Sequence, residues 1–359
     1  MRVDQYLPSF APYDAIGAHA LQVRKALRLA GYRSEIWAAE IHGALRAQAR
    51  PFGEDLERCR ERLLLYQCST SSPLANWLAA RAKAGEPLLS QYHNITPPRY
   101  FERWDRSAAR AMEQARDELA ALASAVGLAM AVSVFNEREL TECGYLRTAV
   151  CPLLVDLEAY HRPPRSSTLE RLRRRKARSG AQWLFVGRFV PNKCQHDVIA
   201  AFAAYRYVFD HRARLTLAGW GGQPRYRSAL ERLARQLELG ESVELVEGAD
   251  EADLLAYWEV SDVFVCMSEH EGFCVPVLEA MELGVPVVAY SAAAVPETLG
   301  EAGVLLEDKK PIAVARAVHE VCTTGARERL VAAGRARAAG YSLANSSRRF
   351  LSILAEFSQ

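Results

Sequence analysis

The chain has 359 residues, of which 50% are hydrophobic and 25% charged, and its formal net charge is +2 at pH 7. This length exceeds that of one typical domain and predicts two domains of similar size. The near-neutral balance excludes a dedicated nucleic-acid binder, which normally carries a strong basic excess. The eight cysteines are scattered without a CxxC pair. We therefore expect a reducing compartment and no disulfide or structural zinc.

The chain shows no sequence signal for export or for crossing a membrane. Its first residues lack a signal-peptide pattern, and the longest apolar stretch, Leu119 to Val132, is too short to span a bilayer. We expect a cytoplasmic protein, at most peripheral at the inner face of the membrane.

The first half of the chain alternates between strand and helix patterns. Such alternation predicts a parallel sheet with crossover helices. Strands are expected at Arg2–Leu7, Ser34–Ala39, Leu63–Cys68, Leu88–His93, Leu128–Val132 and Ala149–Val155, and helices at Ala18–Ala30, Tyr100–Ala123 and Glu137–Gly144.

A basic segment follows this half. Residues 162–178 carry eight Lys or Arg against one acid, together with Pro163 and Pro164. This composition is typical of an exposed linker between domains. The alternative is contact with an anionic membrane surface, where each cation contributes roughly 1 kcal/mol.

Strand and helix patterns then alternate again, which predicts a second doubly wound domain. Strands are expected at Trp183–Val186, Leu215–Ala218, Val243–Val246, Val263–Cys266 and Val285–Tyr290, and helices at Gln195–Tyr207, Arg225–Leu237, Glu251–Trp258, Pro276–Leu283, Ile312–Cys322, Ala326–Ala338 and Leu343–Phe357. We assign an N-terminal Rossmann-like domain to residues 1–160, a linker to 161–179, a C-terminal Rossmann-like domain to 180–341 and a closing helix to 342–359.

The strongest functional signal is the loop and helix at residues 268–281. Doubly wound sheets bind ligands at the carboxyl ends of their strands, and this loop follows the expected strand Val263–Cys266. Gly272 permits close backbone approach, and Pro276 suits the first turn of a helix whose free amides favour an anion. Glu271 and Glu279, with seven residues between them, can hold hydroxyls at two ends of one ligand. A capped helix with an incidental surface glutamate is the structural alternative.

A second signal follows the strand Trp183–Val186. Gly187 and Arg188 come directly after this strand, and Lys193 lies five residues beyond the arginine. Two fixed cations on a permissive loop suit the negative charge that develops on a departing nucleotide diphosphate. Taken alone, the pattern also fits a solvated loop.

These motifs together resemble the family-4 retaining glycosyltransferases of the GT-B fold. The resemblance rests on Gly187-Arg188 with Lys193, and on Glu271-Gly272-Phe273 followed by Glu279-Ala280-Met281. It implies two Rossmann-like domains facing across a cleft. The closing stretch with Tyr341-Ser342 resembles the family's final helix, which crosses back onto the first domain.

The resemblance also implies roles for individual residues. Arg188 and Lys193 would bind the donor diphosphate, Glu271 the transferred sugar and Glu279 the ribose. His93 occupies the strand end where the family has a histidine facing the donor sugar. The remaining donor-binding candidates are Gly187, Gly272, Phe273, Cys274, Val275 and Val246, the last by backbone contact with the base.

The segment between the first strand and helix is the expected acceptor side. Family members often have two adjacent glycines there, and this chain has only Gly17. Asp14 and His19 are acceptor-side candidates, with helix capping and packing as the structural alternatives.

The predicted function is transfer of a hexose of mannose or glucose type, with retention and without a metal. The donor would be a GDP- or UDP-linked sugar, with no further cofactor, and no DxD motif is apparent for a divalent ion. The acceptor would be a saccharide or lipid-linked saccharide hydroxyl in surface polysaccharide or lipopolysaccharide biosynthesis. The alternatives are a nucleotide-sugar epimerase of the same fold and a catalytically inactive binding scaffold.

Overall fold

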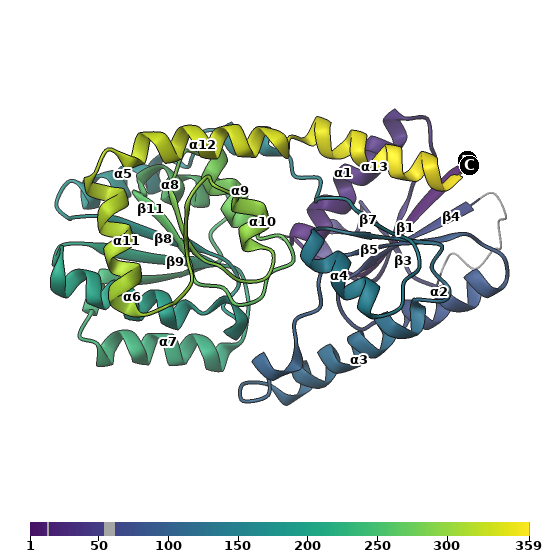
Figure 1. Cartoon of the computed structure of the whole chain (residues 1–359), viewed down its shortest axis with the longest axis horizontal. Helices are drawn as coiled ribbons and strands as arrows, with labels where there is room; N and C mark the ends of the chain where they lie inside the picture. The colour runs from purple at the N-terminus through teal and green to yellow at the C-terminus, as the bar shows by residue number, and fades with distance from the viewer. Residues whose placement is uncertain (13, 54–61, 359) are drawn as a thin grey trace. The chain divides into compact units, whose positions relative to one another are not determined.

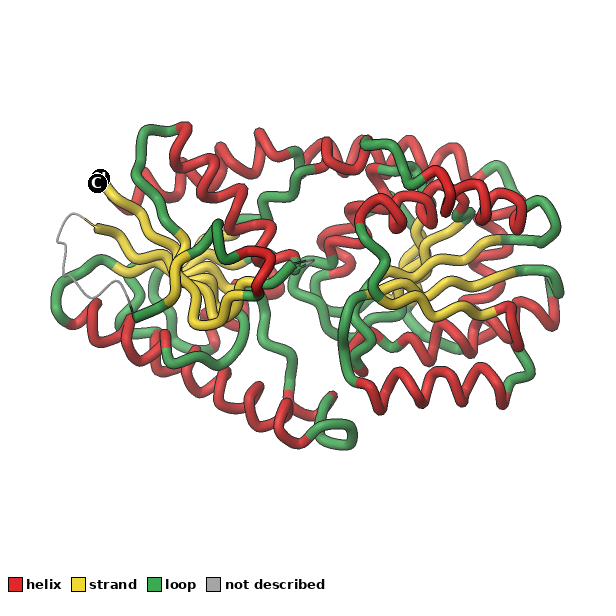
Figure 2. Tube along the Cα trace, turned by 180° about the vertical axis from the view of Figure 1, so that it is seen from behind, coloured by secondary structure: helices red, strands yellow, loops and turns green. Residues whose placement is uncertain are grey.

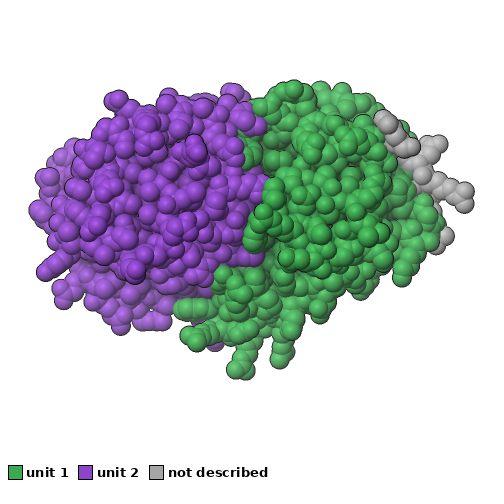
Figure 3. Space-filling model, viewed as in Figure 1, with its two compact units in different colours: residues 1–156, 341–359 green, residues 157–340 purple. Residues whose placement is uncertain are grey.

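The computed structural model describes residues 1–12, 14–53 and 62–358. The chain divides into two compact units (Figure 3). Unit 1 holds residues 1–156 and 341–359, and unit 2 holds residues 157–340. The first unit therefore ends at Asp156, before the expected boundary at residue 160. Among the helices of the described residues, none combines the length and apolar character needed to cross a membrane.

Unit 1 is built on a seven-stranded, wholly parallel sheet in the order β3-β2-β1-β4-β5-β6-β7 (Figure 1). The strands are β1 Arg2–Phe10, β2 Ile36–Ile41, β3 Arg50–Pro51, β4 Arg62–Cys68, β5 Leu88–Tyr92, β6 Leu128–Ala131 and β7 Thr148–Val150. The helices are α1 Ala15–Leu29, α2 Leu74–Lys83, α3 Arg106–Leu122, α4 Val134–Glu142 and α13 Leu343–Ser358.

The alternation of side chains along β4 explains how both faces of this sheet are covered. Leu64 and Tyr66 face a core shared with α2, α3 and α4, whereas Leu63 and Leu65 face a core shared with α1 and α13. Because both faces are covered, the central strands are buried along most of their length, including polar residues such as Asp4, Gln5 and Gln91. Phe350 and Leu354 bring α13 onto the second face, so the expected return of the final helix to the first domain is confirmed.

Unit 2 contains a six-stranded, wholly parallel sheet in the order β10-β9-β8-β11-β12-β13, with helices on both faces (Figures 1 and 2). The strands are β8 Gln182–Val186, β9 Arg214–Gly219, β10 Val243–Glu247, β11 Val263–Cys266, β12 Val287–Tyr290 and β13 Val304–Leu306. The helices are α5 Ser166–Lys176, α6 Gln195–Val208, α7 Pro224–Gln236, α8 Glu251–Val260, α9 Val275–Glu282, α10 Val295–Leu299, α11 Pro311–Thr323 and α12 Ala326–Gly340.

The basic segment at residues 162–178 is not an exposed linker, and that prediction is corrected. It forms helix α5, which belongs to unit 2 and packs against α8 through the buried side chain of Leu172. Acids of the same unit pair with its cations: Arg165 with Asp250 and Asp253, Arg173 with Glu259, Arg175 with Glu244, and Lys176 with Asp262. The basic residues therefore hold helix α5 against the rest of unit 2, through ion pairs with acids that are distant in sequence.

Candidate functional site

The order of strands in unit 2 fixes where a ligand site is expected. Strands β8 and β11 are neighbours in the sheet, and the strands that follow them in sequence lie on opposite sides, β9 next to β8 and β12 next to β11. The chain therefore turns to opposite sides after β8 and β11, and ligands of such sheets bind at this switch point, at the carboxyl edge. Both loops singled out in the sequence, 187–193 and 268–274, start at this point.

Lys193 and Glu271 meet where these two loops come together. Lys193 ends the short 3-10 helix η4 (Pro191–Lys193), and its Nζ lies 2.5 Å from Glu271 Oε2. The Glu271 side chain is 8% exposed, and that of Lys193 is 20% exposed. Burial lowers the pKa of Lys193, but the Glu271 carboxylate outweighs this effect and leaves that pKa raised. The lysine therefore stays charged, as an anion-binding role requires.

Further contacts, from residues outside the predicted motifs, hold the two loops together. The Asn192 amide donates to the His270 carbonyl at 3.0 Å, and the backbone N–H of Glu269 donates to the Asn192 carbonyl at 2.9 Å. Lys309 pairs with Glu269 and also with Asp197 near the start of α6. Sequence reasoning missed Asn192 and Lys309 because both act through partners far away in the chain.

The start of helix α9 lies at the end of the same loop. Cys274 is its N-cap residue and adopts a left-handed conformation with φ 68°, and Pro276 lies in the first turn. No side chain of the described residues caps this end. Pro276 has no N–H and the Val277 N–H donates to the Cys274 carbonyl, so the Val275 amide is the group in this turn that is left for an anion, which the helix dipole also favours. Phe273 is buried, and its carbonyl accepts a hydrogen bond from the Thr298 hydroxyl.

Glu279 lies one turn into α9 and has one oxygen without a partner among the described residues. Its Oε1 accepts a 2.6 Å hydrogen bond from the Tyr160 hydroxyl, whereas Oε2 is buried and unpaired. Burial raises the pKa of Glu279 to about 7, even though the Tyr160 bond acts in the opposite direction. A buried acceptor of this kind suits a ligand hydroxyl. Tyr160 was not predicted, since it lies at the expected domain border.

Arg188 differs from Lys193 in being exposed. Its side chain has no hydrogen bond or ion pair within the described part of the chain, so it is available to a ligand. Gly187 before it has φ 155°, and Gly219 at the end of β9 lies so close that an added Cβ would be 2.1 Å from the Gly187 carbonyl oxygen. These two glycines let the β8 and β9 ends approach closely and set the course of the loop.

A pair of thiols lies beneath the Glu271 loop. Sγ of Cys266, the last residue of β11, is 3.9 Å from Sγ of Cys274, and both side chains are buried. The hydrogen bond between the two sulfurs lowers the pKa of Cys266 and raises that of Cys274. Sequence spacing gave no sign of this contact, because it depends on the turn that connects β11 to α9.

In unit 1, His93 follows β5 and lies among polar side chains from neighbouring elements. Its Nε2 is 2.6 Å from Gln67 Oε1, and its ring packs edge-on against His19 at 5.2 Å. Burial, together with His19, places the pKa of His93 well below its usual range. Nδ1 is buried without a partner among the residues described. A neutral imidazole with one free nitrogen can accept from, or donate to, a sugar hydroxyl.

The acceptor-side candidates in unit 1 also have structural roles. Asp14 is the N-cap of α1, and its carboxylate accepts from the Gly17 amide at 3.0 Å. His19 is buried, its Nδ1 accepts from the Leu154 amide at 2.9 Å, and burial lowers its pKa to about 4. Gly17 lies against Phe10, where an added Cβ would be 3.4 Å from the ring.

Val246, the residue expected near the base, is in the edge strand β10, paired in register with Ala218.

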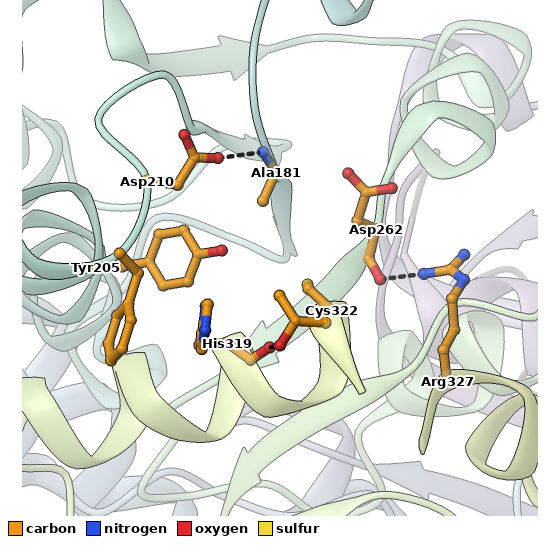
Figure 4. A pocket seen from close by; sticks show the side chains of 9 residues that line it. Ala181, Tyr205, Asp210, Asp262, His319, Cys322 and Arg327 are labelled. Carbon is orange, nitrogen blue, oxygen red and sulfur yellow. Dashed lines mark hydrogen bonds between the residues drawn. The ribbon is translucent and has the colours of Figure 1, made fainter. Parts of the chain in front are cut away.

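A cavity of about 400 Å³ lies at the opposite, amino edge of the sheet, where Ala181 precedes β8 and Asp262 precedes β11 (Figure 4). Tyr205, His319 and Arg327 also line it, and it contains none of the predicted site residues.

Just under half of the chain, including the Lys193–Glu271 contact, is similar to a known sequence family. Residues 170–337 match the family described as Glycosyl transferases group 1. This group 1 segment contains Gly187, Arg188, Lys193, Glu271 and Glu279. It therefore includes the predicted donor-binding residues, whereas His93 and the acceptor-side candidates lie outside it.

Curated relatives align chiefly with part of the chain. This chain is 32% identical to D-inositol 3-phosphate glycosyltransferase of Geodermatophilus obscurus over 205 residues. The alignment covers 54% of this chain and 44% of that protein. This chain is also 31% identical over 160 residues to the GDP-mannose-dependent alpha-(1-6)-phosphatidylinositol monomannoside mannosyltransferase of Mycobacterium tuberculosis, covering 42% and 40%. The chain thus spans less than half the length of these relatives.

Solved structures show that the fold extends over the whole chain. Anabaena Alr3699/HepE in complex with UDP has a TM-score of 0.78 at 18% identity, covering 99% of this chain and all of that one. Sucrose-phosphate synthase from Thermosynechococcus elongatus has a TM-score of 0.77 at 19% identity, covering 99% of both chains. The expected architecture of two Rossmann-like domains is confirmed.

Proposed function

We propose that this chain is a retaining, metal-independent glycosyltransferase that moves a hexose from a nucleotide diphosphate to a hydroxyl acceptor. The observation that carries the proposal is the contact between Lys193 and Glu271 at the β8–β11 switch point. It combines a charged lysine, an adjacent helix start and a carboxylate in one place. That combination suits a ligand that is anionic at one end and rich in hydroxyls at the other.

The proposed role of each residue follows from the exposure of its side chain and from its hydrogen-bond and ion-pair partners. Arg188 and Lys193, with the positive end of the α9 dipole and the Val275 amide, would bind the diphosphate and stabilise its charge as the sugar departs. Glu271 would accept hydroxyls of the transferred sugar, and Glu279 Oε2 would accept from the ribose. The loop residues Gly187, Gly272, Phe273, Cys274 and Val275 would lie against the donor, with Val246 near the base. His93 stays a predicted sugar contact, and Asp14, Gly17 and His19 stay predicted acceptor-side residues.

The proposed reaction is attack from the face of the leaving group. The acceptor hydroxyl forms the new bond to the anomeric carbon while the bond from that carbon to the phosphate oxygen breaks, and the hydroxyl proton passes to that oxygen. Configuration is then retained without a protein nucleophile. Catalysis depends on positioning and on the charge of Arg188, Lys193 and the start of α9.

The identity of the substrates is proposed from the relatives. One relative is named as GDP-mannose-dependent, and a structural neighbour was solved with UDP-glucose. A GDP- or UDP-linked hexose is therefore the proposed donor. Another relative is the O-antigen chain mannosyltransferase B of Escherichia coli, 28% identical over 163 residues. We accordingly propose a saccharide or lipid-linked saccharide acceptor in surface polysaccharide assembly. Acids of unit 2 pair with cations of residues 162–178, which leaves fewer of these charges for an anionic membrane surface.

The test is a turnover assay with GDP-mannose and UDP-glucose, each with and without a panel of saccharide acceptors and with a chelator. The proposal expects acceptor-dependent release of nucleotide diphosphate, unaffected by the chelator, and an axial product linkage by NMR from an axial donor. A sugar converted without an acceptor would identify an epimerase. No turnover of either donor, with or without an acceptor, would indicate the inactive scaffold.

A further inference from the structure

Three metal-ligating atoms lie together beside the Lys193–Glu271 pair. The sulfurs of Cys266 and Cys274 and a carboxylate oxygen of Glu271 all lie within 4.8 Å of one another. The three residues are 1%, 5% and 7% exposed. Cys266 is the last residue of β11 and is held by pairing with β12. Glu271 lies in the loop that follows, and Cys274 is the N-cap of α9.

The spacing of the two sulfurs matches that of a tetrahedral zinc site. Zinc–sulfur bonds of about 2.3 Å at a tetrahedral angle place the two sulfurs about 3.8 Å apart. The observed Sγ–Sγ separation is 3.9 Å. The two thiols therefore need almost no movement relative to each other to hold a zinc ion.

The charges of the cluster also suit a divalent ion. Two thiolates and the Glu271 carboxylate carry three negative charges, and a zinc ion together with the Lys193 ammonium supplies three positive charges. Glu271 Oε2 also accepts from the Lys193 ammonium, so the lysine lies next to the cluster as its fourth charged group. Because the assembled group is neutral, its burial carries no uncompensated charge. Binding would release the two thiol protons to solvent.

We propose that Cys266, Cys274 and Glu271 form a binding site for a thiophilic divalent cation, with zinc as the ion whose chemistry fits. The three protein ligands leave the fourth tetrahedral position open. Since Glu271 is also a proposed sugar ligand, a bound ion would inhibit sugar transfer. That consequence rests on the proposed function, whereas the metal site itself does not.

A second group of possible ligands provides a matched control. Cys194, His196 and Asp197 also lie within 4.8 Å of one another. Lys309 holds Asp197 at 2.6 Å, and His196 contacts the Tyr226 hydroxyl at 2.9 Å. This group has a single thiol, His196 is exposed and Asp197 is only partly buried, so we expect it to bind zinc more weakly than the buried pair of thiols.

The experiment titrates the reduced, metal-free full chain with zinc in competition with a chromogenic chelator. We expect one tight site in the wild type, and an affinity reduced by more than about 100-fold in Cys266→Ser and in Cys274→Ser, since losing even a supporting partner costs about 10- to 100-fold. The control Cys194→Ser should bind as the wild type does. Absence of stoichiometric binding, or equal binding by all four proteins, would overturn the proposal.

A spectroscopic measurement on the wild type avoids any dependence on folding of the variants. Cobalt substituted for zinc should give intense tetrahedral absorption and a sulfur charge-transfer band of the strength of two thiolates. A weak octahedral spectrum without that band would contradict the site. A protein that binds zinc but transfers no sugar even when it is metal-free would overturn the proposed function and leave the metal site standing.

Discussion

The ammonium group of Lys193 lies 2.5 Å from Oε2 of Glu271, although 78 positions separate the two residues in sequence. The contact joins the loops that leave neighbouring strands β8 and β11 at the carboxyl edge of the sheet. The opposite edge has a similar pair, Lys176 and Asp262, at 2.7 Å. Only the first pair adjoins the start of α9, so only it lies where an anionic ligand is expected.

Replacing Lys193 by methionine is expected to destabilise the fold. The change leaves the Glu271 carboxylate buried without its cation, which typically lowers the free energy of unfolding by about 3 kcal/mol or more. Adding Glu271→Gln to this variant should restore part of the loss, because the buried charge is then removed. Denaturant unfolding of the two single variants and the double variant measures this. Strictly additive losses would show that the two side chains do not interact.

Glu279 is expected to make stability fall as the pH rises. Burial raises its pKa from 4.5 to about 7 in the folded chain, so between these values the folded state keeps a proton that the unfolded state has lost. The free energy of unfolding should therefore decrease across this window, by at most about 3 kcal/mol at 1.36 kcal/mol per pH unit. Glu279→Gln keeps an acceptor for Tyr160 and should remove this component. Identical pH profiles for the two proteins would refute the assignment.

His19 is expected to have the opposite effect. Burial lowers its pKa from 6.5 to about 4, so the unfolded chain takes up a proton first as the pH falls through this range. The free energy of unfolding should then rise with pH between about 4 and 6.5. His19→Asn retains an acceptor for the Leu154 amide and should flatten this part of the profile. An unchanged slope in the variant would show that the pKa of His19 does not differ between the folded and unfolded states.

Gly219 is expected to tolerate no side chain. A Cβ there would lie 2.1 Å from the Gly187 carbonyl oxygen, so Gly219→Ala must displace the loop that carries Arg188. We expect a loss of about 1–3 kcal/mol in the free energy of unfolding, as for other overpacked sites. Gly325→Ala is the matched control, since nothing lies within 4 Å of its Cβ position. Equal stability of the two variants would contradict the close approach.

The strands and the larger helices could be predicted from sequence because both sheets are parallel and buried on both faces. Val263–Cys266 is continuously apolar, and Leu63–Cys68 is apolar except for Gln67. Helix α2 and the short strand β13 were missed. Helix α2 has no side-chain N-cap among the described residues, and β13 has only three residues. These elements form because neighbouring elements pack against them.

The charged residues of the candidate site could be predicted from the sequence. The contacts that support them could not. Arg188, Lys193, Glu271 and Glu279 follow strand ends, which the sequence marks. The Tyr160 bond to Glu279 and the approach of Cys266 to Cys274 depend on the turn of the chain around α9. The helical state of residues 166–176 was missed for a similar reason, because its charges find partners on α8 and β10.

The most direct test of the central claim is calorimetric binding of UDP and GDP to five purified proteins. These are the wild type, Lys193→Met, Arg188→Ala, and two controls with equivalent changes at the amino edge of the sheet, Lys176→Met and Arg212→Ala. The account predicts saturable binding of at least one nucleotide to the wild type and both controls, with affinity reduced at least about 10-fold, about 1.4 kcal/mol, in the two site variants. Equal affinity in all five proteins, or binding reduced only in the controls, would contradict it.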